Sequence, residues 1–517
     1  MPTPQGKRQG ASVRDRTLVL LVPLAAAASA PYEGKGKVMS SNRVVFQSPQ
    51  FAVLSDSQLQ GLHFAALEVL RRTGIRFHHQ GALELLKKSG AFISNGNLVK
   101  FPARLVEDAI ASTPSRIVMC DRDGQPAMFL EGSKVYFGTG SDCPYLLDPE
   151  TGKHRACTQA DLINAYRLCD ALPNIHFVMS VGIPSDADPT STYDIQMALM
   201  LEHTTKPIIF VTNDRASCQR AIDMAAAVAG GYKALTEQQH ILLYSEPSSP
   251  LQQSETAVDK LLLMAEYGLP VVHSPGPQMG ATAPITMAGG LAMSLAEILS
   301  ALVVHQLKRR GAPFVFSAGL HHMDMGSAQI CYASPEFQLT KAAIAELGRW
   351  YGIPTWGYAG CSDAKVMDEQ AALEAMLSVL MAKFSGANLI HDVGYLESGL
   401  TTSFEMIVLT DELIAMTDHI MKGIEVSENT LMLDELDTVG PSGHFLDTEQ
   451  TLKRFRDFWI PGLLDRKRRE QWLEAGATTL GQRLNARVME ITKEHQPKPL
   501  EPEIKQQVQE ILAQAVG

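Results

Sequence analysis

The chain has 517 residues, of which 45% are hydrophobic and 20% charged, and its formal net charge is -11 at pH 7. A chain of this length and composition can bury a large apolar core. Its acidic balance argues against nucleic acid and membranes as partners, because both bind clustered Lys and Arg. The basic run Arg466-Lys467-Arg468-Arg469 is a local exception that fits a solvated helix face.

The N-terminus and the cysteines give conflicting indications of location. Basic residues precede the apolar run Leu18 to Leu24, and small residues end at Ala30, as in a secretory signal. The seven cysteines are scattered without a C-x-x-C pair, which favours reduced thiols and a cytoplasmic location. We therefore treat residues 1–38 as an N-terminal extension or signal-like segment, and we favour an extension upstream of a true start at Met39.

Residues 39–130 are predicted to form a helical cap. Leu59, Leu62, Ala66 and Leu70 fall near helical spacing, and Leu83 to Leu86 mark a second helix. Phe101-Pro102-Ala103 opens a third helix. This segment leads into a region with a different repeat.

Between residues 131 and 423, eight short apolar runs recur, each followed by a helical stretch. The runs are 135–137, 176–179, 207–211, 241–244, 270–273, 313–316, 354–358 and 388–391. Buried parallel strands read as continuous apolar runs, and their alternation with helices indicates right-handed crossover units. Eight such units predict a closed (β/α)8 TIM barrel with an N-terminal helical cap and a C-terminal helical extension.

The ends of these runs are rich in polar residues, for example Ser141-Asp142, Ser245-Glu246 and His391-Asp392. Barrel enzymes place their chemistry at the carboxyl ends of the strands. An open doubly wound sheet follows the same rule, but no G-x-G-x-x-G follows the first run, so we favour the barrel.

The last part of the chain is predicted to be helical. Phe404 to Met421 forms a long apolar helix, and residues 424–517 alternate helices with turns that contain proline. We expect this C-terminal helical region to pack against the outside of the barrel or against another subunit.

Several segments resemble the trimethylamine methyltransferase family of corrinoid-dependent enzymes. They are Gly138-Thr139-Gly140, Pro284 to Glu297, Ser334-Pro335-Glu336, the loop Ala359 to Lys365, and Ser385 to Asn388 leading to Leu396-Glu397. The similarity extends in order from about Asp56 to the C-terminus. It implies transfer of a methyl group from a substrate nitrogen to the cobalt of a separate corrinoid protein that docks over the barrel mouth.

The resemblance breaks at one position that bears on the substrate. Members that act on trimethylamine carry pyrrolysine in the loop after the seventh strand, and the matching position here is Cys361. A quaternary ammonium already has its positive charge and a neutral leaving group, so it needs only positioning in a dry, electrostatically suited pocket. We therefore expect a small quaternary amine as substrate, with glycine betaine first.

A trimethylammonium group is usually held by aromatic faces and a carboxylate. Candidate residues for binding the substrate are Phe137, Tyr145, Trp356, Tyr358 and Tyr395 as aromatic faces, Glu246, Asp363 or Asp392 as the anion, and His273, His322 and His391 as donors to a substrate carboxylate. Each aromatic residue could instead face the surrounding helices. A lone histidine at a strand end is more often structural, and we place His391 first among the three.

Cys361 and Asp363 are the candidate catalytic positions. Cys361 could accept the methyl group covalently, but no adjacent histidine activates it and direct transfer to cobalt makes that step unnecessary. We favour a packing role at the pocket wall for this thiol. Lys365 could form a Schiff base, and an ion pair with Asp363 or Asp368 is the simpler interpretation.

Two other functions stay open at this point. One is a barrel lyase or aldolase that uses Lys365, and the other is a noncatalytic subunit that docks a corrinoid protein. We propose no metal ligands, because the histidines and acidic residues show no diagnostic spacing. The corrinoid (cobalamin) is expected on the partner protein, and relatives suggest a homo-oligomer.

Overall fold

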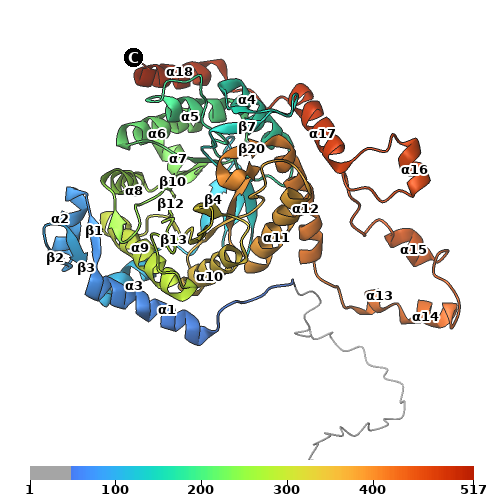
Figure 1. The fold of residues 1–517 in the computed structure, drawn as a ribbon, viewed down its shortest axis with the longest axis horizontal. Coiled ribbons are helices and arrows are strands. Elements are labelled where there is room, and N and C mark those ends of the chain that lie inside the picture. Colours follow the sequence, from blue (N-terminus) through green and yellow to red (C-terminus); the bar gives the residue numbers. More distant parts are fainter. Residues whose placement is uncertain (1–47, 517) are drawn as a thin grey trace, which may run out of the picture. The chain divides into compact units, whose positions relative to one another are not determined.

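The computed structural model describes residues 48–516 of the chain. The predicted extension or signal-like segment of residues 1–38 therefore lies outside the described residues. The described part is a mixed α/β structure in which short strands alternate with long helices (Figure 1).

Seven of the eight predicted runs form parallel strands. They are β6 (Tyr136–Thr139), β9 (Ile208–Phe210), β10 (Ile241–Ser245), β12 (Val271–His273), β14 (Phe314–Val315), β17 (Trp356–Tyr358) and β18 (Leu389–Val393). They belong to two sheets, with strand orders β14-β12-β10-β9 and β17-β18-β6, and every pairing within these sheets is parallel.

The predicted closed barrel is not confirmed, because no sheet of the described residues closes on itself. The second predicted run makes only single-residue bridges, Gly138 with Phe177 and Val178 with Ile208, and a third bridge joins Phe316 to Thr355. Backbone bonds remain, since the N–H of His176 donates to the carbonyl of Phe137 at 2.6 Å and that of Val178 to Pro207 at 3.0 Å, and side chains supplement them. The imidazole of His176 accepts from the backbone N–H of Phe137, and the hydroxyl of Thr139 accepts from the N–H of Met179.

Long helices follow the parallel strands and surround them in Figure 1. They are α4 (Gln159–Ala171), α5 (Thr192–His203), α6 (Arg215–Ala229), α7 (Tyr232–Glu237), α8 (Glu255–Tyr267), α9 (Met287–Lys308), α10 (Pro335–Tyr351), α11 (Glu369–Ser385) and α12 (Phe404–Met421). Residues beyond the strand ends begin several of them. The Asp214 carboxylate accepts from the N–H of Ser217 at the start of α6, and Asp368 does the same for α11.

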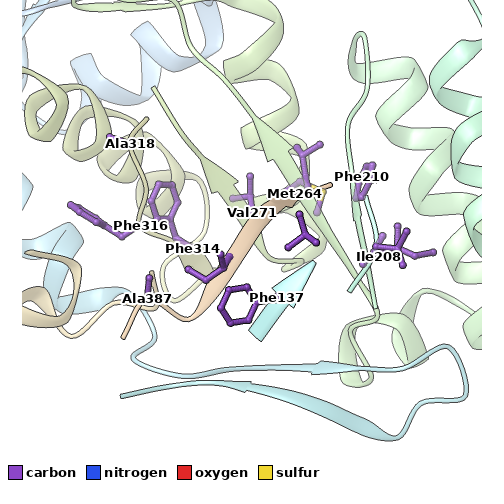
Figure 2. Packing of buried hydrophobic residues seen from close by; sticks show 14 of the residues in the cluster. Phe137, Ile208, Phe210, Met264, Val271, Phe314, Phe316, Ala318 and Ala387 are labelled. Atoms are coloured by element: carbon purple, nitrogen blue, oxygen red, sulfur yellow. The ribbon is translucent and has the colours of Figure 1, made fainter. Parts of the chain in front are cut away.

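The strands bury both faces, and alternate residues enter two separate clusters. In the larger cluster, Phe137, Ile208, Phe210 and Phe314 pack with residues of the surrounding helices, such as Met264 of α8 (Figure 2). The smaller cluster takes the other face of the same strands and contains Phe177, Ile209, Leu242, Tyr244, Val272, Val315, Trp356, Tyr358 and Leu389. The two clusters are separate because successive side chains of a strand point to opposite faces of the sheet.

The N-terminal region contains the three predicted helices and strands that the periodicity did not predict. The elements are α1 (Asp56–Glu68), η1 (Val69–Thr73), β1 (Ile75–Phe77), α2 (Gln80–Lys88), β2 (Phe92–Ser94), β3 (Leu98–Lys100), α3 (Ala103–Ser112), β4 (Ile117–Cys120) and β5 (Pro126–Leu130). Strands β1 to β3 join β11 (Gln252–Gln253) in one sheet, and helices α1 to α3 pack against α9.

Two small sheets lie in the connections that leave the carboxyl ends of the parallel strands. One has the order β13-β15-β16 and consists of Gln278–Met279, His321–Asp324 and Gln329–Cys331. The other has the order β19-β20-β7-β8 and consists of Tyr395–Leu396, Thr401–Ser403, Tyr145–Leu147 and His154–Ala156. The short helix η2 (Glu397–Gly399) joins β19 to β20.

Beyond α12 the chain forms α13 (Glu428–Leu431), α14 (Leu433–Val439), α15 (Glu449–Arg454), α16 (Arg469–Glu474), α17 (Leu480–Glu494) and α18 (Pro502–Val516). Helix α17 packs against α12 and α4, and α18 packs against α5 and α6. None of residues 421–483 is buried. The division of the chain into a cap, a barrel and a C-terminal region stays a prediction.

Among the described helices, α9 alone is long and apolar enough to pass a test for membrane spans by length and composition. Of its most apolar 18-residue window, 83% is buried inside the structure. Its apolar surface is therefore used in packing against α1, α3 and α8.

Candidate active site

A cavity of about 410 Å³ lies where the parallel strands end. Residues at or just beyond the carboxyl ends of β6, β9, β10, β12, β17 and β18 contribute to its wall. The lining consists of Ser141, Asp142, Tyr193, Val211, Tyr244, Ser245, Glu246, Lys260, Gly276, His321, Tyr332, Tyr358, His391, Tyr395 and Gly399. Convergent polar groups and aromatic rings in one concave site are typical of a site for a small molecule.

A larger hollow of about 680 Å³ lies between α1, α9 and α10. Its lining is almost entirely apolar and includes no titratable side chain. We take the smaller cavity as the candidate active site, because chemistry requires polar and ionisable groups, which this cavity gathers at the strand ends and the larger hollow lacks.

Five tyrosines line the cavity, and hydrogen bonds fix three of their hydroxyls. Tyr244 donates to the carboxylate of Glu246, and the hydroxyl of Tyr358 lies 2.9 Å from that of Ser274. The hydroxyl of Tyr395 donates to the carbonyl of Ser141 and accepts from its N–H at 2.6 Å. These three rings are therefore held in place before any ligand binds.

The ring of Tyr395 lies against the backbone of Gly140. A Cβ atom at residue 140 would come within 2.1 Å of this ring, so only glycine allows the contact. The resemblance in the Gly138-Thr139-Gly140 stretch thus has a physical counterpart at the cavity wall.

Two carboxylates face the cavity, and burial raises the pKa of both. Glu246 is accessible to solvent through the cavity, but protein atoms surround it, and this desolvation raises its pKa. Desolvation raises the pKa of Asp142 to about 6, although a hydrogen bond from Ser180 acts in the opposite direction. Each carboxylate would regain favourable electrostatic energy from a cation in the cavity.

A third carboxylate, that of Asp392, is 1% exposed and lies beside His391. The Nδ1 atom of His391 is 2.8 Å from Oδ1 of Asp392, yet neither side chain makes a hydrogen bond of good geometry within the described structure. An uncompensated buried carboxylate is costly, so a cationic ligand nearby would stabilise it. The negative charge of Asp392 also adds to the effect of burial in raising the pKa of Tyr332 and Tyr395.

The imidazole of His391 is surrounded by aromatic rings. Its centroid lies 4.5 Å from the Tyr358 ring, 4.6 Å from the Trp356 ring and 5.5 Å from the Tyr244 ring. These contacts connect the cavity lining to the smaller apolar cluster beneath it.

Basic groups at the cavity are buried, and burial lowers the pKa of two of them, Lys260 and His321. Lys260 of α8 donates to the carbonyl of Thr212 at 2.5 Å, and burial lowers its pKa. Burial lowers the pKa of His321 to about 3, and neither of its ring nitrogens has a hydrogen-bond partner within the described residues. His321 is therefore neutral at pH 7 and stacks on Phe337 with a centroid distance of 4.3 Å.

The structure brings some predicted binding residues together. Glu246, Tyr358, His391 and Tyr395 line the cavity, and Asp392 is buried next to His391. Trp356 is buried below the cavity lining, in contact with His391 and Tyr244.

Four other predicted binding residues do not line the cavity. Phe137 lies in the cluster between strands and helices (Figure 2). The ammonium of Lys383 is 5.2 Å from its ring centroid. Tyr145 is 41% exposed and stacks on His154. His273 is buried and pairs with the amide of Gln253 at 2.9 Å. His322 points to the opposite side of β15 from His321, because successive strand residues alternate.

The two predicted catalytic residues lie behind the lining. Cys361 is 1% exposed in a small cluster with Cys143 and Tyr395, and burial raises the pKa of its thiol. Asp363 accepts hydrogen bonds from the backbone N–H groups of Tyr332 and Ala333. It therefore holds the segment that carries a lining tyrosine.

Sequence reasoning did not select Asp142, Tyr193, Tyr244, Lys260, His321 and Tyr332 as site residues. Asp142 and Tyr244 could have been found, because both lie at the end of a predicted strand. Tyr193 and Lys260 are on α5 and α8, and nothing in their local sequence indicates that they reach the cavity. Among the described residues, no group of three or more His, Cys, Asp or Glu side chains is placed to hold a metal ion.

The mixed α/β fold and the cavity at its strand ends are typical of an enzyme that acts on a small molecule. The sequence model of the trimethylamine methyltransferase family matches residues 26–515. The chain belongs to this family and is a methyltransferase.

Two relatives illustrate the range of the family. The trimethylamine methyltransferase MttB of Desulfitobacterium hafniense is 33% identical over 454 residues, covering 88% of this chain and 92% of the relative. A glycine betaine methyltransferase from another strain of that species is 28% identical over 469 residues, covering 90% and 97%.

Solved structures support the fold. The monomethylamine methyltransferase MtmB of Methanosarcina barkeri has a TM-score of 0.52 at 12% identity and covers 86% of this chain and 88% of its own. A complex of MtmB with hydroxylamine has a TM-score of 0.51 at 12% identity, with 89% coverage of both chains.

Proposed function

We propose that the protein moves a methyl group from a small quaternary amine, glycine betaine first, to Co(I) of a separate corrinoid protein. The observation that carries this proposal is the cavity lined by five tyrosines with two carboxylates on its wall and a third beneath it. Each ring face over a trimethylammonium group contributes about 0.5–2 kcal/mol, more where water is excluded. A neutral methylated compound would gain little from such a lining.

The reaction requires no covalent intermediate on the protein. The N–CH₃ bond breaks and its electron pair stays on nitrogen. The product from glycine betaine would therefore be dimethylglycine, whose nitrogen is uncharged on leaving. The electron pair of Co(I) forms the new bond to the methyl group. The protein's contribution is to orient the cation, exclude water and provide fixed negative charge.

The carboxylate of glycine betaine needs a partner at one end of the cavity. Lys260 and His321 both line the cavity and carry donor capacity, and Lys260 keeps two N–H groups beyond the one given to Thr212. We therefore add Lys260 and His321 to the predicted donor His391 as groups that would receive this carboxylate.

We propose that the eight strand segments of this protein close into one barrel, and the arrangement of the strands is compatible with closure. The bridges Gly138–Phe177 and Val178–Ile208 connect β6 to β9 through the second predicted run, and the bridge Phe316–Thr355 connects residues next to β14 and β17. With them, the order of neighbours follows the order of the chain and returns from β18 to β6. Closure would place all eight strand ends around one mouth, where a corrinoid protein could dock.

The two alternatives have weaker support. Lys365 is exposed, lies outside the cavity lining and donates to the carbonyl of Asp363 at 2.8 Å, which does not favour a Schiff-base lyase or aldolase. A subunit that only docks a corrinoid protein would not need a formed cavity with buried carboxylates. A cytoplasmic location stays part of the proposal, and all seven cysteines are unpaired.

Spectroscopy of cobalamin tests the proposal directly. Co(I) cobalamin is mixed with the protein and, in separate samples, with glycine betaine, carnitine, proline betaine, choline or trimethylamine. We expect methylation with glycine betaine or a related quaternary amine, and none with trimethylamine. Absence of methylation with every onium compound, using free cobalamin and a corrinoid protein in turn, would overturn the proposal.

A further inference from the structure

Residues 424–479, which we call the arm, carry apolar side chains that nothing in the described structure covers. The arm leaves α12 after Met421, contains α13 to α16 and rejoins the rest of the structure at α17 (Figure 1). Between these points it contacts α12, where the N–H groups of Gly462 and Leu463 donate to the carboxylate of Glu412. Ile424, Leu433, Leu446, Leu452, Phe458 and Ile460 are between 63% and 84% exposed. Exposed apolar surface on this scale marks an interaction site.

The charges of the arm are divided between two limbs. The acidic limb, residues 425–449, has seven Asp and Glu residues and no Lys or Arg. The basic limb, residues 453–469, has seven Lys and Arg residues and two Asp residues. Within the described residues, the one ion pair between these limbs is Lys453 with Glu449, one helical turn apart in α15.

The two limbs also share an apolar hollow of about 400 Å³. Leu431 and Leu436 of the acidic limb face Phe455 and Phe458 of the basic limb across it. A hollow between two oppositely charged limbs could receive apolar side chains from a partner that offers the same charges in reverse order.

We propose that the arm binds the arm of a second copy of this chain, with the acidic limb of each copy on the basic limb of the other. A two-fold axis requires a self-complementary surface, and opposite charge at the two ends of one apolar segment provides it. An interface of standard size takes about 20–30 residues from each partner, which the arm can supply.

The position of the arm in the fold favours a second copy of this chain as its partner over a corrinoid protein, which would dock at the cavity mouth. Helix α12 follows β18 and starts beside β20, near the carboxyl ends of the strands. A helix after a parallel strand returns toward the amino end of the sheet. The arm therefore starts at the end opposite the cavity, and this inference does not depend on the proposed substrate.

Charge reversal in each limb provides the test. Glu428→Lys with Asp434→Lys, Glu435→Lys and Asp437→Lys changes the net charge of the acidic limb from -7 to +1, so that both limbs of this variant are positive. Lys453→Glu with Arg454→Glu and Arg456→Glu changes the net charge of the basic limb from +5 to -1, so that both limbs of the second variant are negative. We expect the full-length protein to be a dimer at about 1 µM and each variant to dissociate with a Kd at least about tenfold higher. Sedimentation velocity measures both.

Mixing the two variants gives the decisive result. The reversed limbs of one variant are complementary to those of the other, so the mixture is expected to regain the dimer as a heterodimer, identified by native mass spectrometry. Lys87→Glu with Lys88→Glu on exposed α2 is the matched control and should leave the dimer unchanged.

Three outcomes would overturn the inference: a monomeric parent protein, variants that stay dimeric, or a mixture of folded variants that stays monomeric. Loss of methyl transfer to a corrinoid protein with dimerisation intact would assign the arm to that partner instead. Leu446→Glu with Phe458→Glu gives a second measurement. It should weaken the dimer without lowering the melting temperature of the monomer, because both side chains are exposed there.

Discussion

Asp142 combines an uncommon backbone conformation with an uncommon protonation equilibrium. Its φ of 66° lies in the left-handed region, where Asn and Asp are the best tolerated residues after glycine. Its carboxyl group has a pKa of about 6 because burial disfavours the charged form. The free enzyme therefore keeps a strained, partly protonated acid at the cavity wall, ready for a cation.

This shift predicts a pH dependence of stability with a definite sign. A carboxyl group whose pKa is raised in the folded state binds its proton more tightly there, so its protonation stabilises the fold and the benefit is lost as pH rises from about 4 to about 6. We expect Asp142→Asn to remove this slope and to raise the free energy of unfolding at pH 7 by at most about 3 kcal/mol.

Denaturant unfolding of both proteins at pH 4.5 and pH 7 measures this effect. The same variant should bind quaternary amines more weakly, since it removes a negative charge from the cavity. Greater stability at pH 7 without loss of amine affinity would show that Asp142 does not face the ligand.

Cys361 illustrates why a residue type alone does not define a role. Its thiol is buried against Cys143 and Tyr395, and a raised pKa keeps it protonated and weakly nucleophilic. The resemblance to the family predicts that it stands where some members carry pyrrolysine, and in the structure it is surrounded by packing partners.

We predict that Cys361→Ala keeps methyl transfer within about threefold of the parent and lowers the free energy of unfolding by about 1 kcal/mol, through lost contacts of one sulfur atom. Initial rates of Co(I) methylation and a denaturation curve separate the two effects. A loss of rate of a hundredfold or more in a folded variant would instead assign chemistry to the thiol.

At the scale of an element, the loop from Ala359 to Asp368 ties three parts of the site together. The carboxylate of Glu374 on α11 accepts from the Ser362 hydroxyl at 2.5 Å and from the Asp363 N–H at 2.9 Å. Asp363 in turn accepts from the N–H of Tyr332 and the hydroxyl of Ser398, each at 2.9 Å. The loop thus joins α11 to two segments that contribute to the cavity wall.

Asp363→Ala is predicted to loosen the Tyr332 segment, because two backbone N–H groups lose their acceptor at a cost of about 1–3 kcal/mol. We expect KM for the amine to rise more than kcat falls, since the change acts through the position of one ring of the lining. Asp324→Ala, at an exposed carboxylate of β15, is the matched control. An equal effect of both changes on KM would contradict the assigned role.

For the whole molecule, ligand binding should be visible as added stability. A ligand that binds only the folded state stabilises it by about 2.7 kcal/mol at a hundredfold excess over its Kd. We predict that glycine betaine raises the melting temperature and that its carbon isostere 3,3-dimethylbutanoate, which keeps the carboxylate but lacks the cationic charge, does not. The two differ in one atom, nitrogen against carbon, so equal shifts would mean that the cavity does not recognise the cationic charge.

Much of the architecture was predictable because strand and helix periods are local properties. The apolar runs predicted seven parallel strands, and the pattern from Phe404 to Met421 gave the bounds of α12 as observed. The second run, 176–179, forms single bridges instead of a strand, and the side chains of His176 and Thr139 add hydrogen bonds to the few backbone bonds there. Side-chain hydrogen bonds of this kind leave no trace in hydrophobic periodicity.

The sequence by itself determined that this is an α/β enzyme with its polar residues at strand ends, and its motifs indicated the family. The tertiary structure decided which of those residues share one cavity. Phe137 and Tyr358 look alike in an apolar run, but the face of each strand is set by its neighbours, and only Tyr358 faces the cavity. Tyr193 and Lys260 reach the same cavity from helices far apart in sequence, since convergence in space depends on how the whole chain packs and not on local pattern.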